Sequence, residues 1–237
     1  MKFTETNYNE LKLKCENHFD ASKDIGDLFG GPSLYFHNRA LYECEVNFLS
    51  NNHIEMIYAT LCSWGMHRMG NTSTKMVEFN IFKNSILKFK EELKELNELN
   101  LENIQIDDLP ILIKKISEIC FNLKSSMSNS YIVGNSKTLA HIIPNLVPPI
   151  DRQYTIRFFS SEPNAFFKMN GKLKQVSDFK DTPHEKECFY HILDRTYNFI
   201  HHVKNNDKIL IQQPFHTSFP KIFDNLIVSY VKNVSPA

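Results

Sequence analysis

The chain has 237 residues, of which 42% are hydrophobic and 12% aromatic, so it is long enough to bury one sizeable, aromatic-rich core. Its 27 lysines and arginines balance 27 aspartates and glutamates. This balance excludes binding of a polyanion through bulk positive charge, and any nucleic-acid site would have to be a local patch.

Helical periodicity recurs along most of the chain, and glycines and prolines mark the breaks. Extended structure is indicated only weakly, at residues 208–215. The expected helices, in chain order, lie at residues 8–19, 30–49, 53–70, 76–99, 107–123 and 136–143, then from residue 151, at 183–203 and at 218–231. The pattern predicts an all-α fold of about nine or ten helices.

These helices predict a single multi-helix domain, residues 1–237, with a helix-turn-helix core at residues 107–159. The domain is expected either as one body or as two helical lobes around a cleft near residues 131–157. The five cysteines are scattered and form no C-x-x-C pair, which is typical of reduced thiols in a cytoplasmic protein. The first residues lack the apolar segment of a signal peptide, and no apolar run approaches the roughly 18 residues that span a membrane. We therefore expect a cytoplasmic protein with no membrane partner.

The stretch YIVGNSKTLAHIIPNLVPPIDRQYTIRFF, residues 131–159, carries the clearest pattern. Gly134 and the two polar residues after it are typical of a turn that caps the following helix, and the free amides of a helix N-terminus bind phosphate. Lys137 opens that helix, and Asp151 stands behind two prolines where an N-cap belongs. The simpler interpretation is that Asp151 only caps a helix and that Lys137 is a surface lysine.

The order of glycine turn, lysine-bearing helix, Pro-Ile-Asp and basic helix resembles the helix-hairpin-helix DNA glycosylase superfamily. In that superfamily the hairpin grips the DNA backbone, and in its bifunctional members a lysine attacks the sugar carbon as the base leaves. An aspartate activates the nucleophile and stabilises the cationic sugar. The resemblance implies damaged double-stranded DNA as the partner and no cofactor. It implies Lys137 and Asp151 as catalytic residues, and Gly134, Asn135, Ser136, Arg152, Tyr154 and Arg157 as DNA contacts.

The segment SWGMHRMGNTSTK, residues 63–75, contains the single tryptophan of the chain. Trp64, with His67 and Arg68, could stack on a flipped base or hold a phosphate, so these three residues are the expected base pocket. The alternative is that Trp64 belongs to the core, while His67 and Arg68 cap helix carbonyls.

Two further patterns leave alternatives open. His184, Cys188 and His191 share one face of an expected helix and could hold zinc or iron with a fourth ligand, although an ordinary amphipathic helix explains them equally and we expect no metal. His37 and Arg39 follow a Gly-Gly-Pro turn and suit either a phosphate-binding loop or an ordinary capped helix. No Walker A, GxGxxG, GxSxG or HExxH pattern occurs, which argues against the enzyme classes that carry them.

Two functional hypotheses follow. The first is a DNA-lesion base-excision glycosylase, with or without lyase activity, and the aspartate behind Val-Pro-Pro-Ile favours it. The second is a non-catalytic helical protein-interaction module, which the neutral net charge favours. A structure in which Lys137 and Asp151 face separate regions would exclude the first hypothesis.

Overall fold

The structure is a computed structural model that describes residues 5–23, 30–67, 75–127, 131–160, 166–169, 172–175, 182–212 and 214–234. The described residues are mainly helical, and the all-α prediction is confirmed. The α-helices are α1 (Thr6–Leu13), α2 (Cys15–Ser22), α3 (Pro32–Val46), α4 (Asn51–Leu61), α5 (Phe79–Leu87), α6 (Lys90–Asn97), α7 (Leu109–Cys120), α8 (Ile132–Ile142), α9 (Arg157–Phe159), α10 (Thr182–Val203) and α11 (Phe219–Val234).

Shorter elements connect these helices. The π-helical segment η2 (Cys62–Met66) directly follows α4, and a second one, η5 (Arg152–Ile156), directly precedes α9. Two 3-10 turns, η3 (Leu101–Asn103) and η4 (Ile106–Asp108), precede α7. The strands β1 (Phe166–Met169) and β2 (Lys172–Gln175) pair antiparallel.

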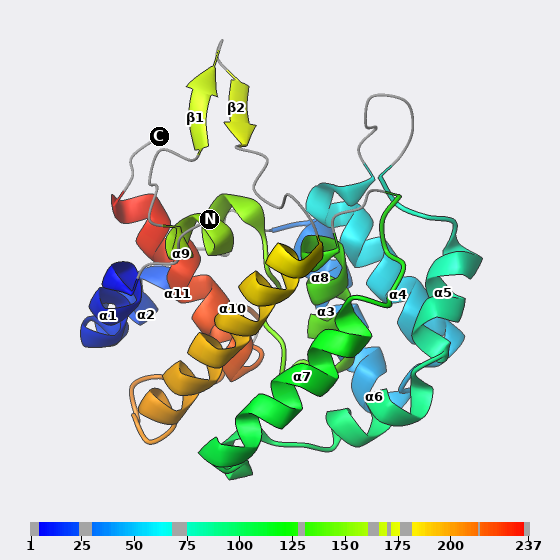
Figure 1. Cartoon of the computed structure of the whole chain (residues 1–237), viewed down its shortest axis with the longest axis horizontal. Helices are drawn as coiled ribbons and strands as arrows, with labels where there is room; N and C mark the ends of the chain where they lie inside the picture. The colour runs from blue at the N-terminus through cyan, green and yellow to red at the C-terminus, as the bar shows by residue number, and fades with distance from the viewer. Residues whose placement is uncertain are drawn as a thin grey trace.

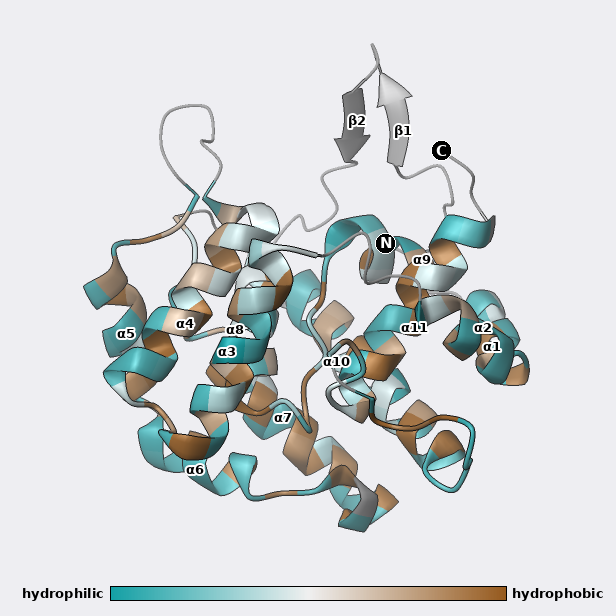
Figure 2. Cartoon of the chain, turned by 180° about the vertical axis from the view of Figure 1, so that it is seen from behind, coloured by the Kyte–Doolittle hydropathy of each residue, from teal (hydrophilic) through white to brown (hydrophobic). Residues whose placement is uncertain are grey.

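The helices form two groups joined by a central set. Helices α3 to α6 lie on one side of the molecule, and α1, α2, α9 and α11 lie on the other (Figure 1). Helices α7, α8 and α10 stand between them, and the reverse view shows the same order. The outer helices α1, α3 and α5 carry both hydrophilic and hydrophobic residues (Figure 2), as expected for amphipathic helices that cover a core.

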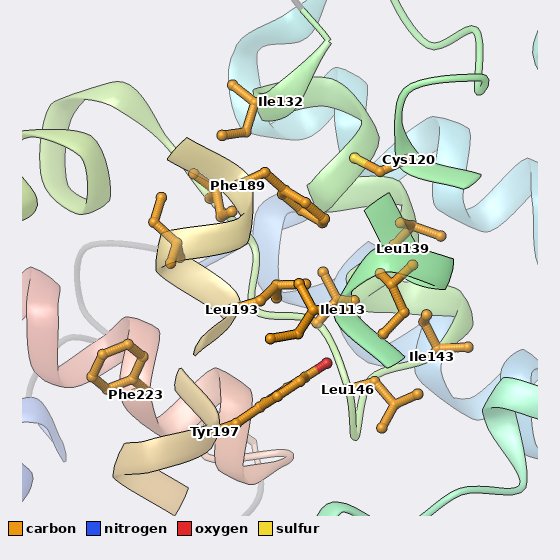
Figure 3. Close-up of a cluster of buried hydrophobic side chains, with 14 of the residues drawn as sticks. Ile113, Cys120, Ile132, Leu139, Ile143, Leu146, Phe189, Leu193, Tyr197 and Phe223 are labelled. Atoms are coloured by element: carbon orange, nitrogen blue, oxygen red, sulfur yellow. The ribbon is translucent and has the colours of Figure 1, made fainter. Parts of the chain in front are cut away.

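One cluster of buried apolar side chains runs through both groups, from Tyr8 to Val231. Its centre lies where α7, α8 and α10 meet, and Figure 3 shows Ile113, Leu193 and Tyr197 gathered there. Helix α7 supplies apolar residues at helical spacing, which is why its sequence predicted it well. Each fully buried side chain of this size stabilises the fold by roughly 1.5–3 kcal/mol relative to exposure.

Two of the expected helices are each divided in the structure. The helix expected at residues 8–19 is divided between α1 and α2, and the one at residues 76–99 is divided between α5 and α6 by a non-helical Phe89. The buried residues continue at helical spacing across that second break, so periodicity alone does not reveal it.

The strand pair β1–β2 was not predicted. Residues 166–175 contain Asn-Gly between the two strands, and that dipeptide is a strong signal for a two-residue hairpin turn. The extended segment expected at residues 208–215 forms no strand in its described part; it contributes one isolated bridge, between Gln212 and His216.

Candidate functional site

A cavity of about 950 Å³ lies where α3, the end of α4, α8, η5 and α11 come together. It is lined by residues from stretches that are far apart in the sequence. The side chains on which its chemistry depends are His37, Trp64, Lys137, Asp151, Lys221 and Asp224. Lys137 and Asp151 therefore line the same cavity and do not face separate regions.

Helix α8 begins at Ile132, four residues earlier than expected. The segment Gly134–Ser136 therefore lies inside its first turns and forms no capping turn. Asn135 and Ser136 are almost fully buried. The amide of Asn135 donates to Cys120 O at 2.6 Å and Leu123 O at 3.1 Å, and Ser136 Oγ accepts from Ile150 N at 3.1 Å. The prediction of a phosphate-holding turn here is wrong, because these polar side chains satisfy buried backbone groups instead.

Gly134 lines the cavity and has a steric role. A Cβ atom at this position would overlap Ser125 Oγ and would lie 2.9 Å from Met66 Cε. Glycine therefore lets α8 approach the chain at residues 125–126 closely. That approach sets where the next turn of α8, with Lys137, meets the cavity.

Lys137 places its ammonium 5.4 Å from the centroid of the Trp64 ring. Burial lowers the pKa of Lys137, and the nearby positive charge of Lys221 lowers it further, while Asp151 and Asp224 act in the opposite direction. Desolvation is the largest of these causes because it penalises the charged ammonium. A lysine with a lowered pKa holds more neutral amine near neutral pH, which is the form that acts as a nucleophile.

Asp151 is both a helix cap and a wall of the cavity. Its Oδ1 accepts a hydrogen bond from Tyr154 N at 2.7 Å, and its own N–H donates to Thr155 Oγ1 at 3.2 Å. The capping interpretation is thus confirmed, and it fixes the carboxylate at the cavity wall. Arg152 and Tyr154 line the same cavity, whereas Arg157, on α9, does not.

Trp64 lies in η2, where Gly65 adopts a φ of 86° that favours glycine. Its ring is half-buried, with its centroid 5.6 Å from the ring of His37 and 5.2 Å from that of His141. His67 also lines the cavity but is exposed, and its Nδ1 bonds to the carbonyl of Cys62. Arg68, the third residue of the expected base pocket, lies outside the described residues.

Sequence reasoning missed the contribution of α11. Lys221 Nζ forms an ion pair with Asp224 Oδ2 at 2.6 Å, and both side chains are largely buried. Burial raises the pKa of Asp224, while the adjacent Lys221 opposes that rise. Lys221 Nζ also lies 5.9 Å from the centroid of the Trp64 ring. The available signal in the sequence was a Lys-x-x-Asp pair within a helix whose buried residues are mostly apolar.

The histidines beside Trp64 form an ordered chain of hydrogen bonds. His141 Nδ1 lies 2.7 Å from the carbonyl oxygen of Lys137, so this nitrogen carries the proton and donates. Burial lowers the pKa of His141 to about 4, so its Nε2 is unprotonated at neutral pH and accepts from His37 Nδ1 at 2.8 Å. His37 is also neutral, since burial holds its pKa well below the ordinary value. Its Nε2 is therefore a bare acceptor, with no partner among the described residues.

No group of three histidine, cysteine or acidic side chains that could hold a metal occurs in the described part of the chain. Of the three residues considered as ligands, Cys188 is buried and His184 is exposed. The zinc or iron alternative therefore gains no support. Among the described residues, no helix has the length and apolar character needed to cross a bilayer.

Comparisons of the chain with protein-family models, with curated proteins and with solved structures found no match. The fold therefore carries no function by analogy. Function has to be argued from the geometry of the cavity and the chemistry of its residues.

Proposed function

We propose that this protein is a base-excision DNA glycosylase acting on damaged double-stranded DNA, with the cavity as its active site. The observation that carries the proposal is that Lys137, Asp151 and Trp64 line one cavity, although they come from three separate stretches of the chain. A volume of about 950 Å³ is in the range of small-molecule sites. A base must leave the duplex to enter such a site.

Lys137 is the proposed nucleophile. Its neutral amine attacks C1′ of the damaged nucleotide, and the bond between C1′ and the base breaks with its electron pair leaving on the base nitrogen, which takes up a proton. The amine nitrogen then loses both of its protons, one to Asp151 and one to the ring oxygen O4′ as the C1′–O4′ bond breaks, which gives an imine between Nζ and C1′. A lowered pKa of Lys137 supports this role, because only the neutral amine can attack.

Asp151 is proposed to stabilise positive charge on the sugar and to accept the proton that Lys137 releases. Its fixed position at a helix cap supports this role, since a preorganised carboxylate acts without reorganisation during the reaction. If water is the nucleophile instead, Asp151 is its general base and Lys137 a phosphate contact. Arg152 and Tyr154 are the proposed DNA contacts at the cavity, whereas buried Asn135 and Ser136 are not carried into the proposal.

Borohydride trapping on a panel of damaged duplexes tests this proposal. The wild-type protein is expected to give a covalent protein–DNA adduct that Lys137→Gln abolishes and Asp151→Asn reduces. Lys94→Gln is the matched control, because Lys94 is an exposed lysine of α6 outside the cavity. Trp64 is the only tryptophan, so its fluorescence reports DNA binding at the cavity in the same samples.

Each outcome of the trapping experiment has a defined meaning. An adduct that depends on Lys137 supports a glycosylase with lyase activity. Base release without an adduct supports water activated by Asp151. Neither adduct nor base release on any duplex, from a folded protein, would reject the proposal and leave the non-catalytic interaction module as the better hypothesis.

A further inference from the structure

Two lysines from different parts of the fold approach the same aromatic ring. Lys137 on α8 and Lys221 on α11 place their ammonium nitrogens 5.4 Å and 5.9 Å from the centroid of the Trp64 indole. Each distance is within the range of a cation–π contact. Like charges repel, and the positive charge of Lys221 is one of the causes that lower the pKa of Lys137.

The surroundings of the two lysines differ. Lys221 has a carboxylate oxygen of Asp224 at 2.6 Å, and its backbone N–H bonds to Ser218 Oγ at 3.3 Å. Charge-assisted contacts of this length are among the strong hydrogen bonds, so this ion pair fixes the position of the Lys221 side chain. Lys137 feels the carboxylates of Asp151 and Asp224 mainly as charges, and desolvation outweighs them. Lys137, whose pKa burial lowers, is therefore the amine assigned to attack.

We propose that Lys137 and Lys221 form a two-amine site for carbonyl compounds, in which Lys137 condenses with an aldehyde while Lys221, paired with Asp224, lies over the same indole and adds a positive charge that disfavours protonation of Lys137. Lys221 is thus a positioning residue that acts through Lys137. The inference rests on the nucleophilic role proposed for Lys137 and does not depend on DNA as the substrate. A planar aldehyde that can lie against Trp64 is the class of ligand that this site fits best.

The condensation of the Lys137 amine with an aldehyde gives an imine and water, and it needs no oxidant, reductant or other reactant. The lone pair of Lys137 Nζ forms a bond to the carbonyl carbon, and the C=O π electrons move to oxygen. Two protons from the amine nitrogen are transferred to that oxygen, which leaves as water, and a C=N bond remains. A supplied hydride donor, cyanoborohydride, then reduces the imine to a stable secondary amine and makes the site of reaction visible.

Reductive labelling of the full chain with pyridoxal tests the inference. The protein is incubated with pyridoxal and cyanoborohydride across a range of pH, and the labelled lysine is mapped by mass spectrometry. Wild-type protein is expected to be labelled at Lys137 in preference to Lys221 and to the exposed Lys94. Labelling of Lys221 in preference to Lys137, or equal labelling of all three, would overturn the inference without the need for any variant.

Substitutions at Lys221 then test its assigned role. Lys221→Met removes the neighbouring charge, so the pH midpoint for labelling of Lys137 should rise and its labelling at neutral pH should fall, because Lys221 is one of the charges that lower the pKa of Lys137. Lys221→Arg keeps the charge and should keep the wild-type midpoint. A folded Lys221→Met protein that labels as the wild type does would overturn the role of Lys221.

The test separates this inference from the proposed function. Selective pyridoxal labelling of Lys137, together with no base release from any duplex, would reject DNA as the substrate and keep the two-amine site. Trapping on damaged DNA that Lys221→Met leaves unchanged would keep the proposed function and reject the two-amine site.

Discussion

Helices α8 and α11 each bring one lysine to the Trp64 ring, and they fix it in different ways. Around Lys137, α8 is fixed by close packing, with Gly134 against Ser125 and with buried hydrogen bonds from Asn135. On α11, Lys221 is fixed by its ion pair with Asp224. Burial without a direct ion pair lowers the pKa of Lys137, whereas Lys221 is held against a carboxylate at 2.6 Å. Two lysines that line one cavity and approach one ring therefore stand in different electrostatic surroundings.

The largest effect expected of a single substitution is on stability, from breaking the ion pair of α11. Lys221→Met leaves Asp224 buried without its cation, which should destabilise the protein by roughly 3 kcal/mol at neutral pH. Chemical denaturation measures this change. The penalty should shrink in acid, because a protonated Asp224 needs no counter-ion.

The double variant Lys221→Met with Asp224→Asn is the control for this prediction. It removes both charges, so it should recover most of the lost stability. A double variant as unstable as the sum of the two single ones would mean that the pair contributes through packing and not through charge.

The buried histidines and the buried Asp224 should contribute to the pH dependence of stability with opposite signs. His53 and His141, both fully buried, have their pKa lowered to about 4. A depressed histidine pKa means that stability is complete above the unfolded value of about 6.5 and is lost as pH falls towards 4, by about 3 kcal/mol for each histidine. The raised pKa of Asp224 acts in the other direction, since its contribution is present below the unfolded value and is lost as pH rises through the folded one.

Unfolding measured between pH 7 and pH 4 separates these contributions. His141→Asn can still donate to the carbonyl of Lys137 but no longer titrates, so stability should fall less steeply with acidification than in the wild type. An unchanged slope would show that His141 does not titrate in this window.

Packing on α8 gives the next effect. Gly134→Ala introduces a Cβ that overlaps Ser125 Oγ and crowds Met66, so we expect a loss of about 1–3 kcal/mol. Melting temperature and denaturant midpoint both report it. A Gly134→Ala protein as stable as the wild type would show that α8 is not fixed by this contact.

The smallest effect concerns the ring that both lysines share. Trp64→Phe keeps an aromatic surface but weakens the attraction of both ammonium groups, by less than about 1 kcal/mol in total. Labelling of Lys137 by pyridoxal should rise slightly, because its charged form loses a stabilising contact. A strong fall in labelling would instead show that the indole positions the aldehyde.

The sequence predicted the all-α class and most helices because apolar residues recur at helical spacing, and it identified Asp151 because prolines and a capping residue are local signals. The turn predicted at Gly134 is wrong, because the sequence does not distinguish a glycine that allows close helix packing from a glycine in a turn. Sequence reasoning also failed to find Lys221 and Asp224. Their role depends on which face of α11 meets Trp64, and only the tertiary fold determines that contact.

Titration of Lys137 itself tests the central claim most directly. Lysine labelled with ¹³C at Cε gives one resonance for each side chain, and Lys137→Gln assigns the signal of interest. If Lys137 is desolvated and Lys221 adds a repelling charge, this resonance titrates below the ordinary lysine pKa of 10.5, and Lys221→Met moves its midpoint upward. A Lys137 resonance that titrates at or above 10.5, and does not respond to Lys221→Met, would contradict the account.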